Sequence, residues 1–173
     1  MSVDFLWHYD SPLGRMTLAS DGGRLTGLWF DGQAHFGENL SSLRENRCVP
    51  VILRTMEWLD MYFCGREPDW KPDLFLRATD FRRRVWEEIL TIPRGQTVSY
   101  RELAGRTWGT EYTRAVSGAV ARNPISLIIP CHRVVGQKGL TGYAGGLDRK
   151  RRLLEMEQAP GDQNPMESLT RIT

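Results

Sequence analysis

The chain has 173 residues, of which 40% are hydrophobic and 25% are charged, and its formal net charge is +2. This is the composition of an ordinary globular protein with enough residues to bury a core, in one domain or in two small ones. No run of eighteen apolar residues exists, which argues against a membrane span, and the start MSVDFLWHYD lacks the basic-then-apolar pattern of a secretory signal. We therefore expect a cytoplasmic protein.

The charge is unevenly distributed along the chain. Residues 1–75 carry 7 basic and 11 acidic side chains, residues 76–152 carry 15 and 6, and residues 153–173 carry 1 and 4. The central block therefore has a net charge of +9 between two acidic ends. Such a block indicates a surface for a polyanion, or else arginines that only solvate helix faces. Charge alone does not separate these two interpretations.

The three cysteines, Cys48, Cys64 and Cys131, are widely spaced. An odd number at such spacing is a poor disulfide framework and is typical of a reducing compartment. The cysteines also do not combine with the three histidines into the close ligand pairs of a structural zinc site. We therefore expect no metal and no cofactor.

Residues 3–31 predict a series of strands separated by turns. Asp21-Gly22-Gly23 lies between two apolar runs and is a strong signal for a hairpin. Residues 48–64 have apolar side chains at helical spacing, and Gly65 supplies a stop. The stretch REPDWKPDLFL, with its two prolines, then marks a boundary near residue 75. Residues 1–75 are thus predicted to form an N-terminal α/β supporting domain.

The second half predicts mostly helices. Thr79 can cap a helix over TDFRRRVWEEIL, Ser99 and Glu102 form a capping box that opens SYRELAGR, and a short helix follows from about 113 to 122. The last two helices are typical of a helix-turn-helix. With a closing helix over roughly 147–157, residues 76–158 are predicted to form a C-terminal domain. The fold class is therefore α+β, with residues 159–173 as a mobile tail.

The stretch IIPCHRVVG places Cys131 directly before His132. A cysteine is a nucleophile only as its thiolate, which requires a base or a positive environment nearby. Adjacent residues of an extended segment point to opposite faces, so contact between these two requires a bend or a bridging water. The pair alone leaves open an inert buried cysteine, which is the commoner fate of a free cysteine.

The wider pattern resembles the O6-alkylguanine-DNA alkyltransferase family. The matching pieces are FRRRVWEEILTIPRGQTVSYRELA, RAVSGAVARNPISLIIPCHRVVG, GYAGG and LDRKRRLLEMEQ, in this order. The resemblance covers residues 79–157 strongly and the first half faintly, through SPLG at 11–14. It implies a DNA repair enzyme that transfers an alkyl group from O6 of guanine to its own cysteine, once per molecule and without a cofactor.

The resemblance also implies roles for individual residues around the cysteine. Cys131 would accept the alkyl group, His132 would be its water-mediated base, and Glu157 would orient that histidine. Tyr143 would lie near the substrate base and help to protonate O6 as guanine leaves. Asn123 would tie together the turn between the recognition helix and the active-site segment.

For DNA, the resemblance implies that Arg114 enters the base stack and that Tyr100 presses on the phosphate backbone. Chemistry on a base inside a duplex requires the nucleotide to be flipped out, and a side chain that fills the gap offsets part of the unstacking cost. We expect a monomer that binds double-stranded DNA through the minor groove without sequence preference. Further expected DNA contacts are Ala115, Ser117, Gly118, Arg122 and Arg133.

Two departures from the family concern the substrate pocket. Ala144 stands where some relatives place a serine, and Ser126 stands where some have a proline, which leaves the acceptance of bulky alkyl groups open. Two other functions compete with alkyl transfer. One is a helix-turn-helix protein whose Cys131 is structural or a redox sensor, and the other is a cysteine hydrolase, although no oxyanion-stabilising motif is evident.

Overall fold

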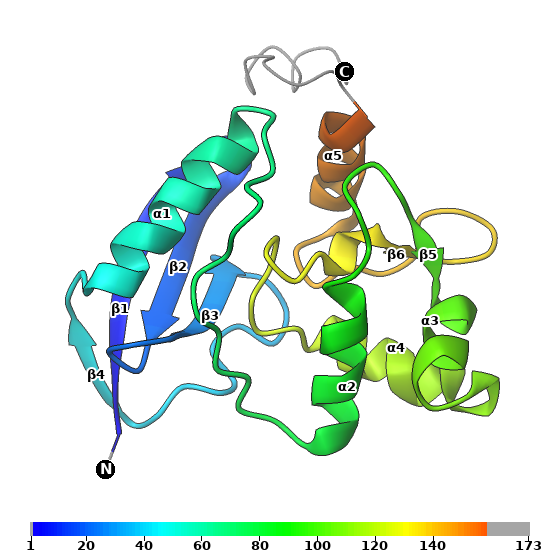
Figure 1. Ribbon diagram of the computed structural model, residues 1–173, viewed down its shortest axis with the longest axis horizontal. Coiled ribbons are helices and arrows are strands. Elements are labelled where there is room, and N and C mark those ends of the chain that lie inside the picture. Colours follow the sequence, from blue (N-terminus) through cyan, green and yellow to red (C-terminus); the bar gives the residue numbers. More distant parts are fainter. Residues whose placement is uncertain (1, 159–173) are drawn as a thin grey trace.

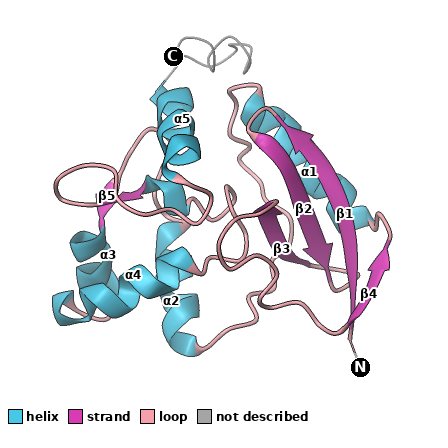
Figure 2. Cartoon of the chain, turned by 180° about the vertical axis from the view of Figure 1, so that it is seen from behind, coloured by secondary structure: helices cyan, strands magenta, loops and turns pink. Residues whose placement is uncertain are grey.

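The computed structural model describes residues 2–158, so the predicted mobile tail at 159–173 lies outside the described residues. A twisted sheet with one helix on its face forms one side of the molecule, and a group of helices forms the other side (Figure 1). The view from behind shows the sheet in front of its helix (Figure 2). The predicted α+β class is confirmed.

Four strands form the sheet. β1 (Val3–Ser11), β2 (Gly14–Ser20) and β3 (Leu25–Phe30) are successive antiparallel strands, and β4 (Leu43–Asn46) pairs with β1 in parallel, which gives the order β3-β2-β1-β4. The predicted hairpin joins β2 to β3, and the Asp21 carboxylate accepts hydrogen bonds from two backbone N–H groups of this turn. The sequence analysis missed β4, because its four residues LREN are all exposed and show no apolar alternation.

Helix α1 (Pro50–Phe63) covers one face of this sheet. Proline at its first position fits a helix start, because the N–H that proline lacks has no partner within the helix there. Its buried side chains recur at helical spacing and point to the sheet and the core: Ile52, Thr55, Trp58, Leu59, Tyr62 and Phe63. Tyr62, near the end of α1, is fully buried.

Two of the remaining helices begin at the predicted capping residues. Thr79 accepts a hydrogen bond from the Arg82 N–H at 3.3 Å, and Ser99 accepts one from the Glu102 N–H at 3.0 Å. The elements are α2 (Asp80–Ile89), α3 (Tyr100–Thr107), α4 (Thr113–Ala121) and α5 (Leu147–Gln158), with a two-stranded parallel pair of β5 (Val98–Ser99) and β6 (Val134–Val135). A 3-10 turn at Thr110–Tyr112 joins α3 to α4, so these helices form the predicted helix-turn-helix.

The outer edge of β3 receives segments of the second half. Leu25 exchanges backbone hydrogen bonds with Asp73 and Phe75, and Leu28 does so with Pro124 and Ser126. These bonds satisfy a strand edge that would otherwise expose unpaired backbone groups. The sheet of the first half therefore fixes the position of the segment that leads to Cys131.

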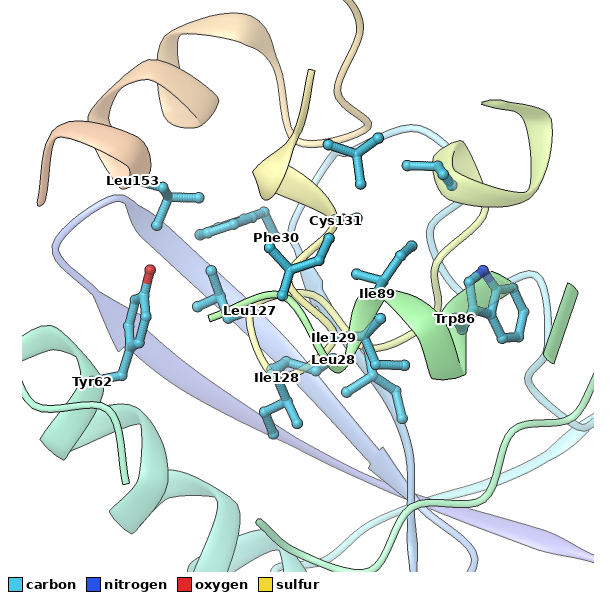
Figure 3. Packing of buried hydrophobic residues seen from close by; sticks show 14 of the residues in the cluster. Leu28, Phe30, Tyr62, Trp86, Ile89, Leu127, Ile128, Ile129, Cys131 and Leu153 are labelled. Carbon is cyan, nitrogen blue, oxygen red and sulfur yellow. The ribbon is translucent and has the colours of Figure 1, made fainter. Parts of the chain in front are cut away.

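One hydrophobic cluster spans both halves of the chain. Figure 3 shows side chains of β3, α1, α2 and α5 around residues 127–129 and Cys131. The cluster contains residues from both sides of the predicted domain boundary near residue 75, so this boundary stays a prediction. No helix among the described residues is long and apolar enough to cross a membrane.

Candidate active site

The segment that carries Cys131 is short and tightly folded. Leu127 has a φ of 71°, which is uncommon for a residue other than glycine, and it lies within a close turn between Ser126 and Ile129. The segment that looked like a simple extended run therefore doubles back beside β3. The Cys131 N–H then donates to the Ile129 carbonyl at 2.7 Å.

Asn123 holds this turn together from within. Its side-chain amide donates to the Ile129 carbonyl at 2.8 Å, and its side-chain oxygen accepts from the Ile125 N–H at 3.0 Å. A buried amide with both ends satisfied fixes the backbone on either side of it. Asn123 thus links the residues after Arg122 to the segment that carries Cys131, and its part in the reaction stays a prediction.

Cys131 opens a 3-10 turn, Cys131–Arg133, instead of continuing an extended segment. This turn supplies a bend of the backbone, which was one of the two ways by which Cys131 and His132 could act together, the other being a bridging water. Only 4% of Cys131 is exposed, and burial raises the pKa of its thiol to about 11, although Asn123 and the Lys150 ammonium oppose the rise. The resting cysteine is therefore a thiol at neutral pH, and its reaction needs a proton acceptor.

His132 is fully buried behind Cys131 and faces a carboxylate. Its Nε2 lies 2.7 Å from Oε2 of Glu157, on α5. Because the carboxylate accepts a hydrogen bond at Nε2, Nδ1 is the nitrogen that can act as a base in the neutral ring. Nδ1 is buried and has no hydrogen-bond partner among the described side chains and backbone.

The Glu157 carboxylate accepts hydrogen bonds from three side chains. Besides His132, its oxygens accept from the Tyr62 hydroxyl at 2.7 Å and from the Arg133 guanidinium at 2.8 and 3.0 Å. Burial alone would raise the pKa of Glu157, but the hydrogen bonds from His132 and Arg133, together with the positive charge of Arg133, hold it well below its ordinary value. The carboxylate stays ionised in a site where an isolated charge would be too costly.

Arg133 was expected to contact DNA, and the structure corrects this expectation. Its side chain is 2% exposed and bonds to Glu157, to the Ile92 carbonyl and to Glu67. These groups satisfy the guanidinium inside the protein, so no donor is directed at a phosphate. Arg133 instead supplies the positive charge that keeps Glu157 ionised.

A cavity of about 450 Å³ opens onto Cys131. Its walls come from α3, α4, the cysteine turn, the glycine-rich segment 141–144 and the loop after β3. The residues that line it are Ala34, His35, Tyr100, Ser117, Val120, Ala121, Cys131, Thr141, Gly142, Tyr143 and Ala144. This volume is in the range of cavities that bind a small organic molecule.

Two tyrosines define the cavity beside the thiol. Burial raises the pKa of Tyr143 well above its ordinary value, and the nearby Cys131 raises it further, so the phenol keeps its proton. The Tyr100 hydroxyl donates to the Thr141 carbonyl at 3.1 Å, which turns this side chain toward the cavity. Ala144 lines the cavity. Ser126 is buried beside Tyr143, with its hydroxyl 3.4 Å from Gln33, so its place in the substrate pocket stays a prediction.

Several residues of the site were missed by the sequence analysis. Tyr62 lies 95 positions from Glu157, and no local pattern links the two. Lys150 is buried, with its pKa lowered to about 8 by burial, and its ammonium donates to the carbonyls of Val134, Thr141 and Gly142. Lys150 thereby fastens the glycine-rich segment to the cysteine turn. The only available signal was a lysine at the second position of the basic run RKRR.

The outer face of α4 presents the residues expected to meet DNA. Arg114 and Ala115 are exposed near its start, and Arg114 forms no ion pair within the part of the chain that the structure describes. Ser117 and Gly118 are partly exposed on the following turn. Arg122, at the end of the helix, lies 3.8 Å from Glu38 of the first half.

The site shows no metal-binding pattern. Among residues 2–158, no group of three or more His, Cys, Asp or Glu side chains could hold a metal ion. The side chains around Cys131 are instead a base, a carboxylate, two phenols and a buried ammonium. This set is suited to proton transfer around a nucleophilic sulfur.

Both halves of the chain match families of known proteins. Residues 80–159 match the family described as 6-O-methylguanine DNA methyltransferase, DNA binding domain, and residues 7–70 match its ribonuclease-like domain. The methylated-DNA–protein-cysteine methyltransferase of Mycobacterium tuberculosis H37Rv is 43% identical over 161 residues, which are 90% of this chain and 96% of that protein. The Haemophilus influenzae protein of the same name is 35% identical, over 92% of this chain and 89% of its own length.

Solved structures agree with these similarities. The crystal structure of Mycobacterium tuberculosis OGT in complex with DNA superposes with a TM-score of 0.82 at 38% identity, and covers 95% of this chain and 98% of that one. An O6-methylguanine DNA methyltransferase from Methanococcus jannaschii superposes with a TM-score of 0.64 at 25% identity, over 89% and 94% of the two chains. The chain therefore belongs to the methylated-DNA–protein-cysteine methyltransferase family.

We predict that Glu157 makes the folded protein sensitive to acid. Because its folded-state pKa is depressed, its stabilisation is present above the unfolded-state pKa of about 4.3 and is lost as the pH falls from there toward the folded-state pKa. Over this pH range, protonation of Glu157 should lower the free energy of unfolding by up to about 1.4 kcal/mol for each pH unit. Urea denaturation between about pH 6 and about pH 3 measures this slope.

The matched variants are Glu157→Gln and Glu155→Gln, on the same helix. Glu157→Gln should lower the free energy of unfolding at neutral pH by about 3–5 kcal/mol, because Arg133 loses a buried partner, and should flatten the slope in acid. Glu155 is exposed, so its variant should keep the wild-type slope. An unchanged acid slope in Glu157→Gln would contradict the assignment.

Proposed function

We propose that this protein repairs DNA by direct reversal, in the cytoplasm, by transferring an alkyl group from O6 of guanine to the sulfur of Cys131. The observation that carries this proposal is a buried thiol at the wall of a cavity of about 450 Å³, with the His132–Glu157 pair behind it. Family membership and the names of the relatives support the same reaction. No cofactor is needed, because the nucleophile, the base and the proton donor are all side chains.

His132 takes the proton of the thiol in this proposal. A thiol with a pKa of about 11 supplies almost no thiolate at neutral pH, so the proton must leave as the substrate reacts. A water between Cys131 and Nδ1 of His132 would relay it, and Glu157 stabilises the imidazolium that forms. Glu157 can do so because Arg133 and Tyr62 keep it ionised and in place.

The transfer is a single displacement at the alkyl carbon. The sulfur forms a bond to this carbon, the bond from carbon to O6 breaks, and its electron pair stays on guanine. Guanine gains a proton from Tyr143, whose phenol remains protonated until then, and the imidazolium restores that proton. The product is a thioether that water does not hydrolyse, so each protein molecule acts once.

Access to the base requires a flipped nucleotide, and the helix-turn-helix is suited to this task. The +9 central block attracts the phosphate backbone without reading sequence. Ala115 and Gly118 give α4 a low profile, which allows a close approach to the minor groove. Arg114 would fill the gap in the stack, and Tyr100 would assist the rotation of the nucleotide beside the cavity. One monomer is sufficient for this arrangement.

We predict that Cys131 becomes alkylated in stoichiometric yield. The protein is mixed with a duplex oligonucleotide that contains one O6-methylguanine, and peptides are mapped by mass spectrometry. Cys131 should carry one methyl group for each lesion removed, and Cys131→Ala should leave the lesion intact. The control Cys64→Ala removes an exposed cysteine and should repair like the wild type. Unmodified Cys131 beside an intact lesion would favour a structural or redox role for this cysteine.

We predict that Arg114→Ala affects duplex DNA more than a free base. Arg114 can fill the gap left by a flipped nucleotide only in a stacked duplex. Because unstacking costs a few kcal/mol, the Arg114→Ala variant should repair duplex O6-methylguanine about tenfold or more slowly. Alkylation of Cys131 by free O6-benzylguanine should change little. Arg47→Ala, which removes an exposed arginine of the first half, serves as the charge control. Equal slowing with both substrates would count against the proposed role.

A further inference from the structure

One wall of the cavity comes from the first half of the chain. Ala34 and His35, which belong to the loop between β3 and β4, line the cavity together with Cys131. All its other lining residues come from the second half. The first half therefore does more than support the fold, because it supplies part of the surface that a substrate would touch.

The loop is fastened to the active-site segments where it enters the cavity. The buried Gln33 accepts a hydrogen bond from the Phe30 N–H at 2.9 Å, and its side chain also meets the Ser126 hydroxyl. The next N–H, of Ala34, donates to the carbonyl of Ala144 at 3.1 Å. The loop is thus joined to the segment before Cys131 and to the glycine-rich segment beside Tyr143.

His35 itself is held in an unusual conformation. Its φ is 61°, in the left-handed region that residues other than glycine rarely occupy, and such strain persists only where the surroundings impose it. Nδ1 of its ring lies 2.6 Å from Glu38, whose other oxygen lies 3.8 Å from Arg122 at the end of α4. The carboxylate holds Nδ1, while Nε2 has no hydrogen-bond partner among the described residues and stays available to a ligand.

We propose that His35 is a specificity-determining residue, whose ring packs against the alkylated guanine in the cavity and limits the size of the alkyl group. This inference rests on the proposed function. A flat imidazole can pack on a purine or on an apolar alkyl group, and its side chain is 28% exposed beside the cavity. The cavity measures about 450 Å³, so the loss of a ring from its wall adds usable space for a larger group.

The test compares two free bases that differ in the size of the alkyl group. Rate constants for alkylation of Cys131 by O6-methylguanine and by O6-benzylguanine are measured by mass spectrometry for the wild type, His35→Asn and His35→Gly. Asparagine and glycine both tolerate the left-handed backbone. The ratio of the benzyl rate to the methyl rate should rise by about tenfold in both variants. His8→Asn, in β1 and away from the cavity, should keep the wild-type ratio.

The outcomes separate this inference from the function on which it rests. A ratio that stays within about twofold of the wild type in both His35 variants overturns the inference but leaves alkyl transfer in place. A wild-type protein that reacts with neither base nor with a duplex lesion removes the proposed function and this inference together. Thermal unfolding is recorded for each variant, and His35→Gly should fold because it relieves the backbone strain. Loss of folding in both variants would show a structural role and overturn the proposal.

Discussion

The buried carboxylate of Glu157 is the interaction on which the rest of the site depends. It accepts hydrogen bonds from α1 through Tyr62 and from the cysteine turn through His132 and Arg133, and it lies on α5. Three elements distant in the sequence are thereby fixed to one group. A buried charge of this kind is tolerated only with full hydrogen bonding, so the donors cannot be removed one at a time without a large cost.

The Cys131 thiol, unlike the Glu157 carboxylate, stays neutral, because burial favours the neutral form and so opposes the form that reacts. Burial leaves only 4% of Cys131 exposed, and it raises the pKa of the thiol to about 11 and so suppresses the reactive thiolate. In our proposal, a base resolves this conflict by taking the proton as the substrate reacts. His132, held by Glu157, would be that base, while Lys150 and Asn123 place positive charge and a donor near the sulfur. In our account, reactivity arises from the arrangement of the site and not from an exposed cysteine.

Much of the fold could be predicted from local signals in the sequence. Thr79 and Ser99 cap the helices that they were expected to cap, and Asp21-Gly22-Gly23 forms the expected turn, because these signals act over a few residues. β4 was missed, since a short exposed strand has no apolar pattern to reveal it.

The candidate site could be predicted only in part. The resemblance named the cysteine, the histidine and the carboxylate, and the structure brings these groups together. Arg133 was expected to contact DNA, but its burial against Glu157 and Glu67 depends on long-range packing that no local pattern shows. Tyr62 and His35 were missed for the same reason, since their partners are set by how the two halves pack.

The pH dependence of Cys131 alkylation tests the central claim, that His132 and Glu157 activate a buried thiol. Rates with free O6-benzylguanine are measured between about pH 6 and about pH 9 for the wild type and for His132→Gln, with folding checked at each pH. The account predicts a substantial wild-type rate at neutral pH, and a much lower variant rate that rises by about tenfold per pH unit toward the thiol pKa of about 11. Equal rates with the same pH dependence in both proteins would contradict it.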